Sequence, residues 1–192
     1  MWLGAEVGFN AGHSSAIWLE GTGVQVVHSF DVLVDAWSTG AVQLIGSLYP
    51  GRHVMHQGDS IYSIPRWWKS QLRAGKKPCD LWYIDGKHTS AWPYEDMYHA
   101  YAASRNGTTM VADDCTRFWG FVLQGWEQMK TKGLVRTPTT FPGKRFYPPH
   151  KYGKSSGFCA GVVVKPAPLR LEWSVPSYKV GPRVLARRTE AL

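Results

Sequence analysis

Short apolar runs alternate with longer mixed segments along the first two thirds of the chain. Apolar runs bounded by turn residues predict buried strands, and the mixed segments between them predict helices. This alternation predicts an α/β domain built around a mostly parallel sheet. The expected strands are residues 2–7, 24–30, 52–57, 80–84 and 108–112. One helix is expected to begin near His13, and three more are expected over residues 36–48, 90–104 and 118–132.

Each expected strand carries a carboxylate at or near its end. These acids recur about every 25 to 28 residues, which is the length of one strand-plus-helix unit. Parallel strands bring their carboxyl ends to one edge of the sheet, where open α/β sheets bind ligands. Any one of the acids could instead cap a helix. The five acids are Glu6, Asp31, Asp59, Asp85 and Asp113.

A glycine turn joins the first strand to the first helix, with Gly8, Asn10 and Gly12 at alternate positions. Glycines let the backbone turn tightly and approach a ligand without a Cβ clash, and the helix that follows offers free N–H groups. A dinucleotide site would need the spacing G-x-G-x-x-G. The departure from that spacing favours a ligand without a pyrophosphate.

The composition is that of an ordinary globular protein, and 192 residues suit one domain. The net charge of +8 favours acidic partners, but we do not expect nucleic acid to be one.

Three distant cysteines argue against a disulfide scaffold or a zinc site, and Cys79 and Cys159 are expected in the core. No signal peptide or membrane-length apolar stretch is recognised, so we expect a cytoplasmic protein. The ten tryptophans could serve aromatic packing or a homodimer interface.

The last third of the chain has a different pattern. Residues 142–157 are rich in Pro, Gly, Lys and aromatics and predict an irregular loop, which could close over the sheet edge and recognise an acidic substrate. Residues 158–164 predict a strand. We therefore expect one domain over residues 1–164 and a basic, proline-containing tail over 165–192.

The strand-end motifs taken together are more specific than any one of them. They are Glu6-Val7-Gly8-Phe9-Asn10-Ala11-Gly12-His13-Ser14, Phe30-Asp31, Gly58-Asp59-Ser60, Tyr83-Ile84-Asp85-Gly86-Lys87-His88 and Val111-Ala112-Asp113-Asp114. This set resembles the class I S-adenosylmethionine-dependent methyltransferases, and within them the small-molecule catechol-type and macrocin-type O-methyltransferases. The resemblance implies a Rossmann-like sheet of seven strands, one of them antiparallel, with helices on both faces. Residues 135–141 and 158–164 would supply the last two strands. The helices that such enzymes carry ahead of the first strand are expected to be absent.

The resemblance also implies a cofactor site for S-adenosylmethionine. The glycine turn would line the methionine part of the cofactor, supported by Glu6, and an acid after the second strand would grip the ribose hydroxyls. That acid is Asp31, although Asp35 lies close enough to replace it. The third strand end would contact the adenine. The implied cofactor-binding residues are Glu6, Gly8, Asn10, Gly12, His13, Asp31, Asp59, Ser60 and Asp85.

A second implied group is catalytic. In catechol-type relatives, acids after the fourth and fifth strands hold Mg²⁺, so Asp85, Asp113 and Asp114 are the expected ligands if a metal is used. His88 lies three residues after Asp85 and could accept a proton at neutral pH, with Lys87 as the second choice of base. His88 could also simply pack or cap a helix.

The function that these features favour is O-methylation of a small hydroxylated molecule, which could be anionic. Two alternatives fit the same sequence features. One is a metal-dependent hydroxylase on the same scaffold, and the other is a non-catalytic module whose basic surface binds nucleic acid.

Overall fold

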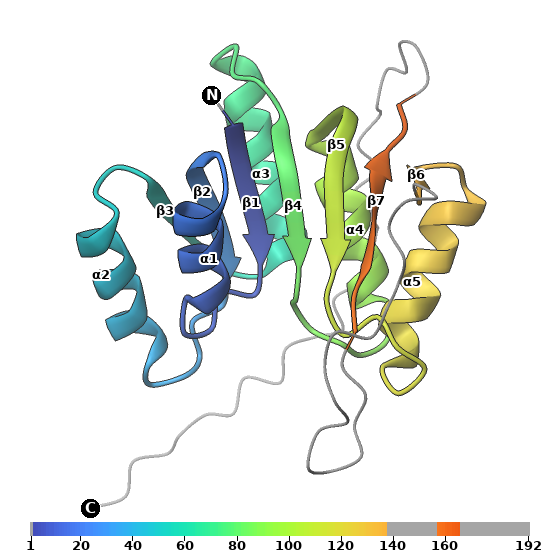
Figure 1. The fold of residues 1–192 in the computed structure, drawn as a ribbon, viewed down its shortest axis with the longest axis horizontal. Helices are drawn as coiled ribbons and strands as arrows, with labels where there is room; N and C mark the ends of the chain where they lie inside the picture. Colours follow the sequence, from blue (N-terminus) through green and yellow to red (C-terminus); the bar gives the residue numbers. More distant parts are fainter. Residues whose placement is uncertain (1, 138–156, 166–192) are drawn as a thin grey trace, which may run out of the picture.

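The computed structural model describes residues 2–137 and 157–165, and the chain forms a seven-stranded sheet with helices on both faces (Figure 1). The strand order is β3-β2-β1-β4-β5-β7-β6. Strands β1 to β5 are parallel, whereas β7 runs antiparallel to both β5 and β6. The elements are β1 (Trp2–Val7), α1 (His13–Gly21), β2 (Val24–Asp31), α2 (Ser38–Leu48), β3 (His53–Gln57), α3 (Ser60–Arg73), β4 (Cys79–Ile84), α4 (Trp92–Ala102), β5 (Ser104–Ala112), α5 (Gly120–Thr131), β6 (Val135–Arg136) and β7 (Cys159–Val163).

Two apolar clusters hold the helices against the sheet, one on each face. The larger cluster joins strand residues to α3, α4 and α5 through side chains such as Trp67, Met97 and Trp126. The smaller one joins β2 to α1 and α2 through Leu19, Val27 and Ile45. Figure 1 shows α1 in front of the sheet and α3 and α4 behind it. The predicted Rossmann-like fold is therefore confirmed.

The element boundaries differ from the prediction in a few places. The strand predicted over residues 135–141 has only two residues in β6, while residue 137 is irregular and 138–141 lie outside the described residues. The helix predicted from residue 90 begins at Trp92, which puts Pro93 in the first turn, where a missing N–H costs nothing. The loop predicted over 142–157 lies almost wholly outside the described residues, as does the tail after residue 165.

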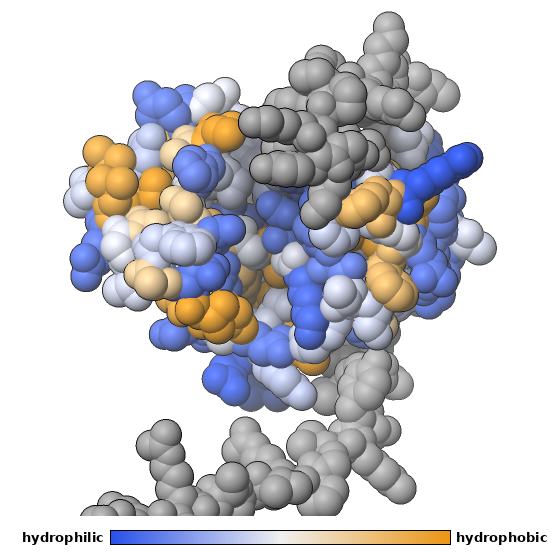
Figure 2. All heavy atoms as spheres, turned by 90° about the horizontal axis from the view of Figure 1, so that it is seen from below, coloured by the Kyte–Doolittle hydropathy of each residue, from blue (hydrophilic) through white to orange (hydrophobic). Residues whose placement is uncertain are grey.

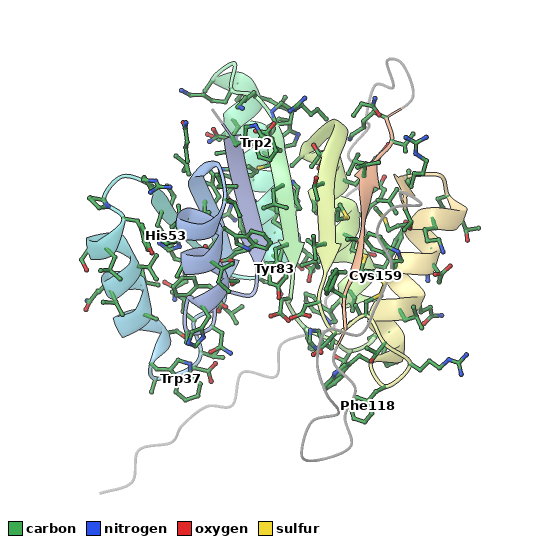
Figure 3. All side chains as sticks on the ribbon, viewed as in Figure 1. Trp2, Trp37, His53, Tyr83, Phe118 and Cys159 are labelled. Carbon is green, nitrogen blue, oxygen red and sulfur yellow. A yellow bond between two sulfur atoms is a disulfide. The ribbon has the colours of Figure 1, made fainter. Side chains whose placement is uncertain are left out.

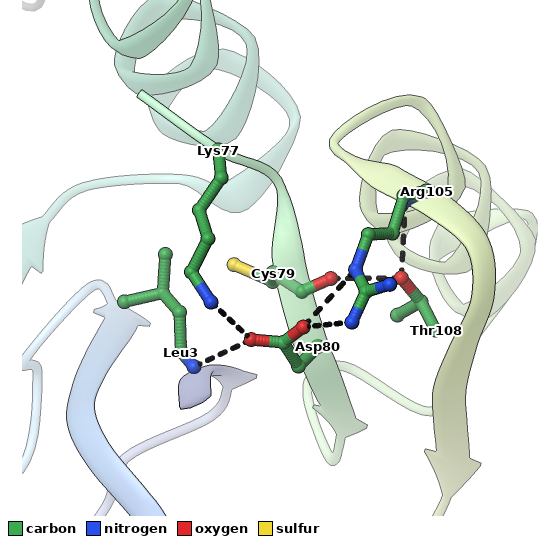
Figure 4. A network of polar contacts seen from close by, with 6 residues as sticks. All are labelled: Leu3, Lys77, Cys79, Asp80, Arg105 and Thr108. Atoms are coloured by element: carbon green, nitrogen blue, oxygen red, sulfur yellow. Dashed lines mark hydrogen bonds and ion pairs between the residues drawn. The ribbon is translucent and has the colours of Figure 1, made fainter. Parts of the chain in front are cut away.

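A buried carboxylate ties three strands together at the amino ends of the sheet (Figure 4). Asp80 of β4 accepts hydrogen bonds from the Leu3 backbone N–H at 2.9 Å, from Lys77 Nζ at 2.9 Å and from the Arg105 guanidinium. Burial raises the pKa of Asp80, but the hydrogen bonds from these donors outweigh it and leave the pKa below its ordinary value. This network lies at the edge opposite the predicted site and serves stability.

The cysteine prediction is wrong in one respect, because Cys115 and Cys159 form a disulfide. Their Cα atoms are 5.5 Å apart, since β7 pairs antiparallel with β5 and brings Cys159 opposite Ala112. Cys79 is a buried free thiol, as expected. The disulfide joins the loop after β5 to the start of β7.

Candidate active site

The glycine turn after β1 is held in a left-handed conformation and packs against the end of β4. Gly8, Asn10 and Gly12 have φ angles of 88°, 49° and 80°. A Cβ on Gly8 would lie 2.0 Å from the Asp85 carbonyl oxygen, so only glycine fits there. The two predicted ligand loops are therefore in direct contact.

Asp31 organises this turn with both of its carboxylate oxygens. One oxygen accepts the backbone N–H groups of Phe9 at 2.7 Å and Asn10 at 3.0 Å, and the other accepts that of Leu33 at 2.6 Å. Each carboxylate oxygen has two lone pairs, so one acceptor position of Asp31 remains for a ligand. Asp35 also lines the cleft described below.

Glu6 lies beneath the turn and is fully buried. It accepts hydrogen bonds from the hydroxyls of Ser15 and, at 2.7 Å, Ser29. Burial raises the pKa of Glu6, and the serine hydrogen bonds only partly offset this effect. Glu6 thus supports the turn from below, while His13 is exposed and does not line the cleft.

A cleft of about 410 Å³ runs along the carboxyl ends of the strands. Figure 2 looks onto this edge and shows a hollow between polar and apolar side chains. Trp37 and Phe118 lie at the same end of the sheet, on its two flanks (Figure 3). Several lining residues were missed by the sequence analysis, among them the exposed Val32 and Val34, which follow β2 directly, and Trp92. The predicted residues that line the cleft are Gly8, Asn10, Asp31, Asp59, Ser60, Asp85 and Lys87.

His88 lies between two of the predicted acids. Its Nε2 is 3.3 Å from Asp85 Oδ1, and its Nδ1 is 3.4 Å from Asp114 Oδ2. The neighbouring Asp85 carboxylate raises the pKa of His88, whereas burial raises that of Asp85. The Trp119 ring meets the imidazole edge-on at 5.1 Å between centroids. The His88 ring is therefore held by charge on two sides and by an indole.

The predicted magnesium ligands are not arranged as a metal site. Within residues 2–137 and 157–165, no three His, Cys, Asp or Glu side chains could together hold a metal ion. Asp113 accepts the Tyr83 hydroxyl at 2.6 Å on one oxygen and the Asp114 backbone N–H at 2.9 Å on the other. The imidazole of His88 occupies the space between Asp85 and Asp114. These residues do not fit the ion.

The family of this chain follows from a match to a known sequence family. The sequence model of a family described as "Methyltransferase domain" matches residues 5–115, from within β1 to the loop after β5. The chain belongs to this methyltransferase family. The match covers the glycine turn and every predicted site residue, so the family and enzyme class predicted from the motifs are confirmed.

Solved structures show the same fold at low sequence identity. The methyltransferase superposes with a TM-score of 0.60 on an O-methyltransferase from Bacillus cereus solved in complex with SAH, at 13% identity over 83% of this chain and 73% of that one. TomG, an O-methyltransferase from Streptomyces achromogenes in complex with SAM, gives 0.60 at 17% identity over 85% and 73%. NodS, an N-methyltransferase from Bradyrhizobium japonicum, gives 0.56 at 11% identity over 85% and 86%. No curated protein sequence matches the chain significantly.

The remaining expectations concern features outside the active site. Among the described residues, no helix has the length and apolar character needed to cross a membrane. The cytoplasmic location, the homodimer and the domain boundaries stay predictions. The basic residues of the predicted substrate loop lie outside the described residues: Lys144, Arg145, His150, Lys151 and Lys154.

Proposed function

We propose that this methyltransferase transfers the methyl group of S-adenosylmethionine to a hydroxyl group of a small molecule. The observation that carries the proposal is the left-handed glycine turn packed against Asp85 at the head of a 410 Å³ cleft. A cleft of this size is within the range of small-molecule and cofactor sites. The printed descriptions of the B. cereus and S. achromogenes enzymes, which name SAH and SAM, support the same cofactor.

The side chains and turns that line the cleft can bind each part of the cofactor. The turn bearing Gly8 and Asn10 would hold the methionine part, and the free acceptor position of Asp31, together with Asp35, would take the ribose hydroxyls. Asp59 and Ser60 would face the purine. Glu6 would act from below the turn, through Ser15 and Ser29.

When bound, the cofactor supplies an electrophilic methyl group on a sulfonium. The protein's task is then to orient the acceptor hydroxyl and remove its proton. His88 Nε2 is buried beside Asp85, so Nδ1, on the Asp114 side, is the atom that would receive the proton. The two carboxylates would stabilise the imidazolium that results. On this proposal the step uses no metal, because His88 takes the proton and its imidazole lies between Asp85 and Asp114.

The acceptor is proposed to be small and anionic. The net charge of +8 supports an acidic acceptor, and Lys87 is an exposed cation in the cleft wall, 4.9 Å from the Trp92 ring. On this proposal Lys87 binds the acceptor rather than acting as the base.

Calorimetric titration with S-adenosylhomocysteine tests the cofactor assignment. The full chain should bind it with a dissociation constant in the micromolar range, and a competing titration with NAD should show no displacement. Absence of heat at any reachable concentration would refute the proposal. Methyl transfer from the labelled cofactor to hydroxylated acids, with and without EDTA, then tests the reaction and its independence of metal.

A further inference from the structure

A carboxylate outside the predicted site lies directly behind the cleft wall. Asp96 belongs to α4 and is only 1% exposed. Its Oδ1 accepts the hydroxyl hydrogen of Ser60 at 2.6 Å, and Ser60 begins α3 and lines the cleft. A Cβ on Gly86 would come within 2.7 Å of Asp96 Oδ2. The carboxylate is thus wedged between the start of α3 and the loop after β4.

The hydrogen bond to Asp96 fixes what Ser60 can offer a ligand. A serine hydroxyl has one hydrogen and two lone pairs, and a carboxylate can only accept. With its hydrogen committed to Asp96, Ser60 turns a lone pair towards the cleft. A hydrogen-bond donor of the ligand can bind this lone pair, whereas an acceptor of the ligand at the same position is repelled by it.

The part of the cleft where Ser60 lies is the part assigned above to the base of the cofactor. Ser60 begins α3 directly after β3 and Asp59, and it lines the same cleft as Gly8 and Asp31. A ligand with its polar chain at the glycine turn and its ribose hydroxyls at Asp31 would place its base at Ser60. This step rests on the proposed function.

We propose that Asp96 is a positioning residue that orients the Ser60 hydroxyl so that the cleft accepts the 6-amino group of adenine and rejects a 6-oxo purine. The pKa of Asp96 supports an ionised acceptor under mildly alkaline conditions. Burial chiefly raises it, to about 7, and Asp59 and Glu95 add to this, while the Ser60 hydrogen bond and the charge of His88 lower it. At pH 8.5 the carboxylate is ionised and can only accept.

The test compares two ligands that differ along one edge of the base. S-adenosylhomocysteine and S-inosylhomocysteine are titrated calorimetrically at pH 8.5. In the inosyl compound an oxo group replaces the 6-amino group and N1 carries a hydrogen, and the Ser60 variant below separates the effect of the 6-position. The wild-type chain should bind the adenosyl compound at least ten-fold more tightly, because one hydrogen bond becomes a repulsive contact. A ratio below about three-fold with tight binding of both would overturn this inference and leave the proposed function intact. Failure to bind either compound would overturn both.

Variants show whether Ser60 and Asp96 cause the discrimination. Ser60→Ala should weaken the binding of S-adenosylhomocysteine about ten-fold and, by removing the repulsive lone pair, should strengthen the binding of S-inosylhomocysteine, so that the ratio collapses. Asp96→Leu, similar in shape but unable to accept, frees the hydroxyl to donate and should shrink the ratio as well. If Asp96→Leu does not fold, Ser60→Ala alone decides, and a retained ratio refutes the inference. Ser47→Ala, on the exposed face of α2, is the matched control and should keep the wild-type ratio.

Discussion

Replacing Asp96 by asparagine should remove a pH-dependent loss of stability from the protein. Burial raises the pKa of this carboxyl to about 7 from its ordinary value of 3.8. The folded chain therefore holds the proton at pH values where the unfolded chain has released it. The free energy of unfolding then falls as the pH rises from about 4 to about 7, and it stays level above that. Asparagine has nearly the same shape and carries no charge, so the variant lacks this slope.

The size of the effect follows from the two pKa values. They differ by about three pH units, each unit is worth about 1.4 kcal/mol, and the full loss is thus about 4 kcal/mol. Between pH 5 and pH 8 about 3 kcal/mol of it should be seen. Urea unfolding of both proteins across this range measures it, as the wild-type free energy of unfolding minus that of the variant.

A suitable control is Glu127→Gln, because Glu127 is paired with Lys130 on the exposed side of α5. Its difference from wild type should not slope with pH over the same range. If the difference between wild type and Asp96→Asn is also flat, Asp96 ionises normally in the folded chain. Burial would then not raise the pKa of the Asp96 carboxyl in the folded chain.

Four further changes test other parts of the structure. Gly8→Ala should abolish S-adenosylhomocysteine binding in calorimetry, because its Cβ would lie 2.0 Å from a carbonyl oxygen, whereas Gly75→Ala, also at positive φ but in open space, should leave binding unchanged. His88→Ala should lower kcat about 10²- to 10⁴-fold and change cofactor affinity less than three-fold; an unaltered kcat would exclude it as the base. Asp80→Asn should lower the free energy of unfolding by about 1–3 kcal/mol with cofactor affinity retained, since it leaves buried donors without their carboxylate. Cys115→Ser should lower the free energy of unfolding by up to about 4 kcal/mol in thermal unfolding, the value expected for opening a loop that spans a sequence separation of 44. Dithiothreitol should lower the stability of the wild type only.

The parts of the site that recur with the strand-and-helix rhythm could be predicted from the sequence. Gly8, Asp31, Asp59 and Asp85 each follow an apolar run, and parallel strands bring such positions to one edge. The pattern could not tell what each acid contacts. Asp31 accepts three backbone N–H groups because the turn after β1 folds back over the end of β2, which depends on the φ angles of the turn.

Contacts between elements that are distant in the sequence were not predictable in the same way. Asp96 lies within a helix, where a carboxylate usually indicates an exposed face, and it is buried because α4 packs against α3. The disulfide had a weak signal, since the expected antiparallel last strand starts near Cys159, beside the end of β5. The magnesium site stays a prediction that the described residues do not support. The sequence pattern placed three acids near one another but could not tell that Tyr83 and His88 contact them.

The aromatic lining of the cleft gives the protein a built-in optical reporter. The indole of Trp92 forms part of the wall, and Phe30, another lining residue, stacks on Trp82 with 6.0 Å between ring centroids. A purine that enters this space displaces water from the Trp92 indole, so the intrinsic emission of the chain should change on occupancy. Nucleosides and acceptor molecules can thus be screened against the unlabelled protein by fluorescence alone. Trp92→Phe is the reference, because its emission should not change when a ligand binds.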